Sequence, residues 1–248
     1  MDPAVLRDDM VDSLEHESKG WVDSESLSVA MRAVPREAFV PDDREAYADR
    51  DVEHLGTRVL APSTVARLVE ALEPAADDSV LVVGAGVGYT AALLAELVGE
   101  RDVHAVDITR RIVYEARANL ADADYDAVLV DCRDGADGLP EYAPYDRILV
   151  EAAAVRPPDA LVDQLAEGGR LVMPLGAGTQ HLAVVHADGE VERHGACAFE
   201  PMLVEGEQHD TVERNRTRRE DREFAARDAR RRKGWELEWI DWERTGQR

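Results

Sequence analysis

Three glycines spaced two residues apart form the segment of this chain that is best suited to bind a ligand. Gly84, Gly86 and Gly88 stand between an apolar run at 80–83 and a run with helical spacing at 89–98. Glycine permits a tight turn and lets backbone N–H groups approach a ligand that a Cβ atom would hold away. The pattern therefore predicts a nucleotide-type site on a strand–loop–helix unit, and a turn with a purely structural role is the alternative.

Acidic residues follow the next two predicted strands. Asp107 ends the first of them, 19 residues after Gly88, where a carboxylate can accept hydrogen bonds from both ribose hydroxyls. Asp134, followed by Gly135, comes after the second strand, where an acid can accept from the exocyclic amine of adenine. Since open α/β sheets bind ligands at the carboxyl ends of their strands, we expect these residues to share one site. An NAD site is an alternative, although Tyr89 stands where the dinucleotide motif G-x-G-x-x-G has its third glycine.

Short apolar strands and amphipathic helices alternate from residue 63 onward and must position these groups. The predicted strands span 80–83, 103–108, 127–130, 147–152, 170–175 and 181–186, and the predicted helices span 64–72, 89–98, 110–120 and 158–165. A turn is expected at Gly168 and Gly169. Continuously apolar strands that alternate with helices are typical of a mostly parallel sheet with helices on both faces. The sequence therefore predicts a Rossmann-like α/β fold.

Two further segments flank the predicted core domain at 63–206. Within residues 1–62, the apolar spacing up to Pro35 predicts an N-terminal helical extension, and 41–61 is predicted as an irregular connector. Residues 207–248 are dense in arginine with interspersed acids, and they contain several tryptophans. This segment has three interpretations: a solvated, partly disordered tail, a helix docked through its tryptophans, or an arginine-rich arm for a partner or nucleic acid.

The charge balance points to an acidic, solvated surface. The 248 residues carry 52 acidic and 29 basic side chains, a formal net charge of −23, and lysine occurs only at Lys19 and Lys233. This composition is typical of proteins from a very salty cytoplasm, where a Debye length of roughly 3 Å or less screens self-repulsion. We therefore expect a halophilic source and no general nucleic-acid binding through the body of the domain.

Cysteine, membrane and metal patterns argue against several other classes. Cys132 and Cys197 fit no redox or metal spacing, and no apolar run reaches about 18 residues. We therefore expect a cytoplasmic protein with free thiols and no membrane contact. His181, His186 and His194 match no common ligand spacing, so no metal is expected.

Six segments of the chain follow the pattern of one enzyme family. They are AVPREAFVP at 33–41, AYADRDVEHLGTRVLAP at 46–62, the glycine loop, the stretch from RDG to VEAAA at 133–154, GGRLVMPLG at 168–176 and CAFEPMLVEGE at 197–207. In these segments the chain resembles the protein-L-isoaspartate O-methyltransferases, over about residues 5–207. The resemblance implies a seven-stranded sheet with CAFEPMLVEGE as its closing strand, and S-adenosyl-L-methionine (AdoMet) as cofactor. It also implies methyl esterification of isoaspartyl-containing proteins or peptides, as repair of damaged proteins.

The resemblance implies a cofactor-binding set that consists of Gly84, Gly86, Gly88, Asp107, Asp134, Gly135 and Gln180. Within this set, the loop glycines would line the methionine part of AdoMet and Asp107 the ribose. Asp134 and Gly135 would lie at the adenine. Gln180 matches a glutamine that lies near the substrate pocket in the family.

The chain departs from the family pattern in the signature and at two other positions. The signature G-Q-T-I-S-x-P reads G-T-R-V-L-A-P at 56–62, so Leu60 stands in place of the active-site serine and Arg58 in place of a threonine. Val82 replaces an acid that precedes the loop by two residues. Glu151 stands at a strand end where the family has a small or hydroxylated residue. Arg58, Leu60 and Glu151 are therefore the candidate catalytic positions.

Methyl transfer to a carboxylate tolerates some of these changes. The nucleophile is already ionised at neutral pH, so alignment of the reactants, worth on the order of 7–11 kcal/mol, dominates over base catalysis. Glu151 would repel an anionic substrate by about 1 kcal/mol or more. Arg58 can offset this repulsion by pairing with Glu151 or by holding the substrate carboxylate, and simple exposure of both side chains is the alternative. His54, beside the altered signature, is either a substrate contact or a surface histidine.

Three functional hypotheses follow from the sequence. The first is an AdoMet-dependent methyltransferase of the isoaspartyl-repair type. The second is a member of the same family that methylates another acceptor, with Glu151 binding a cationic amine or acting as a base. The third is a non-catalytic AdoMet-binding regulatory partner that lost turnover with Leu60 and Val82. The sequence does not predict an oligomeric state.

Overall fold

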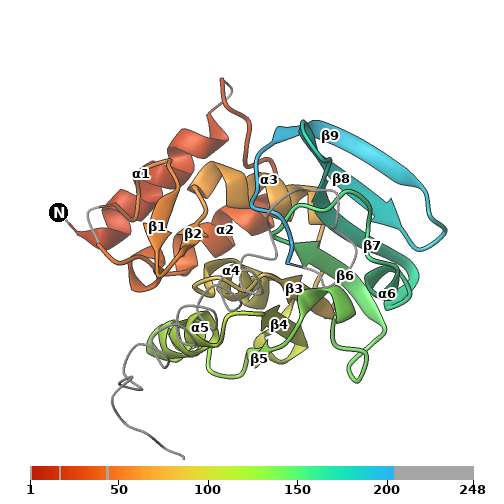
Figure 1. The fold of residues 1–248 in the computed structure, drawn as a ribbon. Helices are drawn as coiled ribbons and strands as arrows, with labels where there is room; N and C mark the ends of the chain where they lie inside the picture. Colours follow the sequence, from red (N-terminus) through yellow and green to blue (C-terminus); the bar gives the residue numbers. More distant parts are fainter. Residues whose placement is uncertain (1, 17, 43–44, 204–248) are drawn as a thin grey trace, which may run out of the picture. The chain divides into compact units, whose positions relative to one another are not determined.

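One seven-stranded sheet forms the centre of the part of the chain that the computed structural model describes, residues 2–16, 18–42 and 45–203 (Figure 1). Its strand order is β5-β4-β3-β6-β7-β8-β9, with β3 (Val80–Val83), β4 (Val103–Asp107), β5 (Leu129–Cys132), β6 (Tyr145–Val150), β7 (Leu165–Leu175), β8 (Gln180–His186) and β9 (Val191–Cys197). The pairs from β5 to β7 are parallel, and β8 and β9 add to the sheet antiparallel. The Rossmann-like, mostly parallel sheet is therefore confirmed. The interpretations of 207–248 concern residues outside this description.

The central strand β3 is buried on both faces, as its continuous apolar run requires. Val80 and Val82 belong to one apolar cluster, and Leu81 and Val83 belong to the other. Because successive side chains of a strand point to opposite faces, β3 contributes to both clusters. The arrangement explains why a pattern without alternation still forms a strand.

Helices cover both faces of the sheet. They are α1 (Pro3–Glu15), α2 (Glu25–Ala33), α3 (Pro62–Leu72), α4 (Tyr89–Val98), α5 (Arg110–Asp122) and α6 (Asp159–Val162), with short 3-10 helices η1 (Arg36–Phe39), η2 (Glu100–Asp102) and η3 (Gly135–Asp137). Apolar side chains of α1 to α5 join the cluster on one face, and Leu161 of α6 joins the cluster on the other. The predicted N-terminal helices therefore pack onto the same core as the sheet.

The connector predicted at 41–61 contains a β-hairpin, so its prediction as irregular is wrong. β1 (Val52–His54) pairs antiparallel with β2 (Thr57–Val59). Leu55 and Gly56 between them both have positive φ, 52° and 82°, which is the geometry of a two-residue hairpin turn whose twist matches the strands. Glycine at 56 is needed for that turn and does not mark the loss of regular structure.

Several predicted boundaries at the other end of the sheet are also wrong. The closing strand is β9 (Val191–Cys197), so only Cys197 of the described part of CAFEPMLVEGE lies in a strand. β9 is almost entirely exposed, which removes the apolar pattern that would have predicted it. The helix predicted at 158–165 is limited to α6, because β7 begins at Leu165 and takes in the expected turn at Gly168.

Candidate functional site

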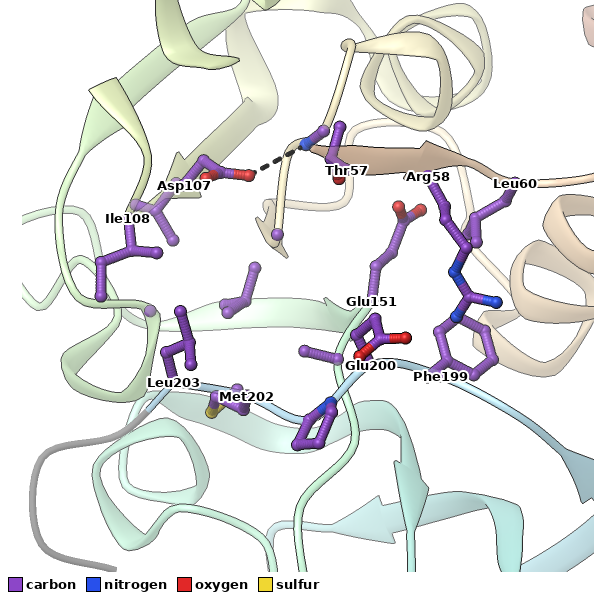
Figure 2. Close-up of a pocket in the computed structure, with 17 residues that line it drawn as sticks. Thr57, Arg58, Leu60, Asp107, Ile108, Glu151, Phe199, Glu200, Met202 and Leu203 are labelled. Carbon is purple, nitrogen blue, oxygen red and sulfur yellow. Dashed lines mark hydrogen bonds between the residues drawn. The ribbon is translucent and has the colours of Figure 1, made fainter. Parts of the chain in front are cut away.

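A cavity of about 170 Å³ lies at the carboxyl ends of β3, β4 and β6 (Figure 2). In the sheet, Val83 lies level with Val106 on one side and Val150 on the other, so the residues that follow emerge at one edge. Open α/β sheets bind ligands at this edge, at the point where the order of the strands in the sheet reverses. Seven of the ten predicted site residues line the cavity: Arg58, Leu60, Gly84, Gly86, Asp107, Gly135 and Glu151.

The three glycines of the loop have different roles. Gly84 and Ala85 donate backbone hydrogen bonds of 2.9 Å to the Val106 carbonyl, which fastens the turn to β4. A Cβ on Gly86, at φ +51°, would meet nothing nearer than 3.9 Å, so this glycine leaves space along the cavity. A Cβ on Gly88 would lie 3.1 Å from Leu120, so this glycine allows α4 to approach α5 and does not line the cavity.

Asp107 is bound to the glycine loop. Its carboxylate accepts a hydrogen bond of 3.2 Å from the backbone N–H of Gly86 (Figure 2) and one of 2.8 Å from the backbone N–H of Thr109. Burial raises the pKa of Asp107, and the two N–H donors oppose that rise because they favour the charged form. The side chain is therefore held at the cavity wall with its oxygens fixed.

Asp134 and Gly135 lie at the start of η3. Asp134 accepts a hydrogen bond of 3.0 Å from Ala136 N and caps η3, and it does not line the cavity. Gly135 does line it, and a Cβ there would lie 2.4 Å from Cγ1 of Val83. Only glycine therefore allows η3 to approach the end of β3 this closely.

The β1–β2 hairpin supplies the opposite wall. Arg58 binds Asp51 at 3.2 Å and the Ala198 carbonyl at 3.3 Å, so the predicted pairing of Arg58 with Glu151 is wrong. Leu60 is 8% exposed and presents an apolar side chain to the cavity. Its carbonyl accepts a hydrogen bond of 2.6 Å from the fully buried Arg36, which fixes this wall to the N-terminal segment.

Glu151 lies directly after β6, and its backbone N–H donates to the Val83 carbonyl at 2.8 Å. Its Oε1 is buried and has no hydrogen-bond partner among the residues that the structure describes. The alternative that Arg58 and Glu151 are simply exposed is therefore wrong for Glu151. Burial raises the pKa of Glu151 to about 7, a hydrogen bond with Thr90 opposes the rise, and the charge of Asp107 adds to it.

Gln180 holds the backbone of a residue that lines the cavity. Its amide donates to the Phe199 carbonyl at 3.0 Å and accepts from the Phe199 N–H at 2.7 Å, and Gln180 itself does not line the cavity. Phe199 begins the segment 199–203, which forms one wall and which the sequence did not predict as part of the site (Figure 2). The segment is also joined to the sheet edge by a bridge between Pro201 and Ala153.

The histidines do not contribute to this cavity. His54 lies with Nε2 2.9 Å from Glu115 of α5, and it is absent from the cavity lining, which leaves its role as a substrate contact a prediction. Among residues 2–16, 18–42 and 45–203, no group of three or more His, Cys, Asp or Glu side chains could hold a metal ion. In the same ranges, none of the helices has the length and apolar character needed to span a membrane.

A family model described as "Protein-L-isoaspartate(D-aspartate) O-methyltransferase (PCMT)" matches residues 7–206. The chain belongs to this family. The match takes in the hairpin, the glycine loop and the segment after β9, so it spans every wall of the cavity. The predicted family and the predicted methyltransferase class are therefore confirmed.

Curated relatives and solved structures agree with this assignment. Proteins named protein-L-isoaspartate O-methyltransferase from Methanopyrus kandleri and Aeropyrum pernix are 41% and 43% identical, and the alignments cover 80% and 79% of this chain and 92% and 78% of theirs. A solved protein-L-isoaspartate O-methyltransferase is 26% identical with a TM-score of 0.72, covering 85% of this chain and 69% of its own. A Plasmodium falciparum protein solved in complex with S-adenosyl-L-homocysteine has the same fold, with a TM-score of 0.72 at 20% identity, covering 79% of this chain and 98% of its own.

Proposed function

We propose that this chain is an AdoMet-dependent methyltransferase that forms methyl esters on isoaspartyl carboxylates of damaged proteins or peptides. One observation carries the proposal: the glycine loop and Asp107 share a single cavity with the hairpin residues that belong to the family signature. The cofactor side and the acceptor side of a methyl transfer must lie this close, because the methyl group passes directly between them.

The cavity fits AdoMet in its chemistry. Gly86 leaves open the space that a Cβ would fill, and Asp107 presents a carboxylate at the end of β4 for the ribose hydroxyls. We place the adenine toward Ile108 and Gly135, and the methionine part along Gly84 and Gly86. Gly88, Asp134 and Gln180 then serve the site by packing and by positioning its walls. When it is bound, AdoMet supplies an activated methyl group.

The acceptor enters between the hairpin and the segment 199–203. A carboxylate acceptor needs no base, since it is ionised at neutral pH, and the protein has only to align it with the methyl group. Leu60 supplies an apolar wall that limits water, and Arg58 fixes the hairpin side of the entrance through its contacts with Asp51 and the Ala198 carbonyl.

The test is methyl transfer from labelled AdoMet to a protein that has been aged to accumulate isoaspartate, with the fresh protein as control. We expect label on the aged protein only, and we expect mild alkali to release it as methanol, because methyl esters hydrolyse and methylated amines do not. Alkali-stable label would support a redirected acceptor. AdoMet binding without any transfer would support a regulatory partner, and either result would overturn the proposal.

We further propose that the protein works in a salty cytoplasm. The net charge of −23 and the near absence of lysine support adaptation to high salt, and the free thiols of Cys132 and Cys197 fit a reducing compartment.

A further inference from the structure

Glu151 lines the cavity and has no cationic partner among the residues that the structure describes. Its Oε1 is buried without a hydrogen-bond partner among the described residues, and the side chain begins beside the glycine turn, with its Cβ 3.5 Å from the position of a Cβ on Gly84. Figure 2 shows this side chain standing between the Asp107 side and the Arg58 side of the cavity. Thr90 bonds to this carboxylate, and the oxygen that is left without a partner calls for a cation or a donor from the ligand.

The surrounding charges do not supply that partner. Asp107 faces the same space from the end of β4 and is itself negative, as is Glu200, which lines the cavity after β9. Arg58, on β2, is the one Lys, Arg or His side chain among the described lining residues, and its guanidinium binds Asp51 and the Ala198 carbonyl. When Glu151 is ionised, its counter-charge therefore comes from a ligand.

Only one of the two proposed ligands has a suitable charge. The isoaspartyl acceptor presents a carboxylate, which Glu151 would repel, whereas the methionine end of AdoMet carries an ammonium group and a sulfonium. We infer that Glu151 binds the ammonium group of AdoMet through Oε1, as a cofactor-binding residue and not as an acceptor-side residue. This inference rests on the proposed function for the identity of the cofactor.

The arrangement couples cofactor binding to a proton. In the free protein the pKa of Glu151 is raised to about 7 by burial, so near neutral pH much of the population is protonated. A bound ammonium group favours the charged carboxylate and lowers that pKa, so binding releases the proton. The affinity for AdoMet therefore rises as the pH increases toward about 7 and falls as the pH drops below it.

Calorimetric titration of AdoMet in two buffers with different ionisation enthalpies measures this release. At about pH 6.5 we expect measurable release of protons, up to about one per AdoMet, from the wild-type protein, and close to none from Glu151→Gln. Glu167→Gln is the matched control, since Glu167 is exposed in β7 and is not part of the cavity. Equal release from wild type and Glu151→Gln would overturn the inference.

Two cofactor analogues locate the interaction on the ligand. S-adenosyl-L-homocysteine keeps the ammonium group, and 5′-methylthioadenosine lacks the whole amino-acid end. We expect Glu151→Gln to bind AdoMet and S-adenosyl-L-homocysteine about tenfold more weakly, and 5′-methylthioadenosine with affinity unchanged. An equal loss for all three ligands, or no loss for any, would contradict the assignment.

These measurements use binding alone, so they separate the inference from the proposed acceptor. If the wild-type protein binds AdoMet and Glu151→Gln changes neither the affinity nor the proton release, the role of Glu151 is refuted and isoaspartyl methylation still stands. Wild-type protein that binds none of the three ligands refutes the AdoMet site itself, and with it both proposals. Cofactor binding with the expected proton release supports the inference whatever the acceptor.

Discussion

The backbone N–H of Gly86 donates to the Asp107 carboxylate across 3.2 Å, so the glycine loop and the end of β4 form one hydrogen-bonded unit. The Gly84 and Ala85 N–H groups reinforce it by donating to the carbonyl of Val106, the residue before Asp107. A ligand that binds this edge of the sheet therefore meets a loop and an acid whose positions depend on each other.

Removal of the Asp107 side chain should weaken AdoMet binding. Asp107→Ala removes the acceptor proposed for the ribose and leaves the N–H groups of Gly86 and Thr109 without their partner, and we expect about 10- to 100-fold weaker binding by calorimetry. Asp107→Asn keeps one acceptor oxygen and should lose less. Unchanged affinity in Asp107→Ala would show that the ribose lies elsewhere.

A methyl group on Gly86 should block the cofactor at a small cost in stability. Gly86 and Gly20 have similar positive φ angles, +51° and +55°, and a Cβ on either would meet no atom closer than 3.9 Å. Each alanine variant should therefore lose about 1 kcal/mol of unfolding free energy, measured by urea denaturation. Only Gly86→Ala should lose AdoMet affinity, by at least about tenfold, since each 1.4 kcal/mol of lost contact is a factor of ten. Equal AdoMet affinities of the two variants would place the cofactor away from the loop.

Substitution of Leu60 should separate fold stability from turnover. Leu60 is 8% exposed, so both Leu60→Ser and Leu60→Ala should lower the free energy of unfolding by about 2–3 kcal/mol. The serine hydroxyl can also donate to the acceptor carboxylate, a hydrogen bond worth about 0.5–1.5 kcal/mol, so kcat/KM for an isoaspartyl peptide should rise about two- to tenfold in the serine variant alone. Identical turnover in the two variants would mean that a hydroxyl at position 60 does not reach the acceptor.

High salt should stabilise the folded protein. Fifty-two acidic side chains against 29 basic ones repel one another in dilute buffer, and potassium chloride screens that repulsion. We expect the unfolding temperature to rise between about 0.1 M and about 2 M KCl, where the Debye length falls from about 10 Å to below 3 Å. Sucrose at matched osmolality is the control, because it acts by exclusion and not by screening. A transition that does not move with KCl would argue against adaptation to salt.

The cofactor half of the site was predictable because its residues follow local rules. β3 and α4 have the bounds that the sequence predicts, since an apolar run, a glycine loop and a helical run are contiguous. Asp107 was located by its distance from the loop. The resemblance of the flanking segments supplied the family, which no local pattern could have done.

The acceptor half depends on contacts between distant residues. The hairpin turn needs Leu55 at φ 52°, a conformation that the residue type does not predict. Asp51 lies within reach of Arg58 across the hairpin and occupies it, so the charge expected to pair with Glu151 is not available. The wall that begins at Phe199 is positioned by Gln180, 19 residues away in the sequence, and no periodicity indicates such a contact.

The most direct test of isoaspartyl methylation is the ratio of kcat/KM for an isoaspartyl peptide to that for the same peptide with normal aspartate, measured with labelled AdoMet in about 2 M KCl. The isoaspartyl linkage shifts the carboxylate relative to the backbone, and a misplacement of about 1 Å can cost about 100-fold in rate. We expect a ratio of at least about 100, with alkali-labile label. Equal rates on the two peptides, or no transfer by protein that binds AdoMet, would contradict it.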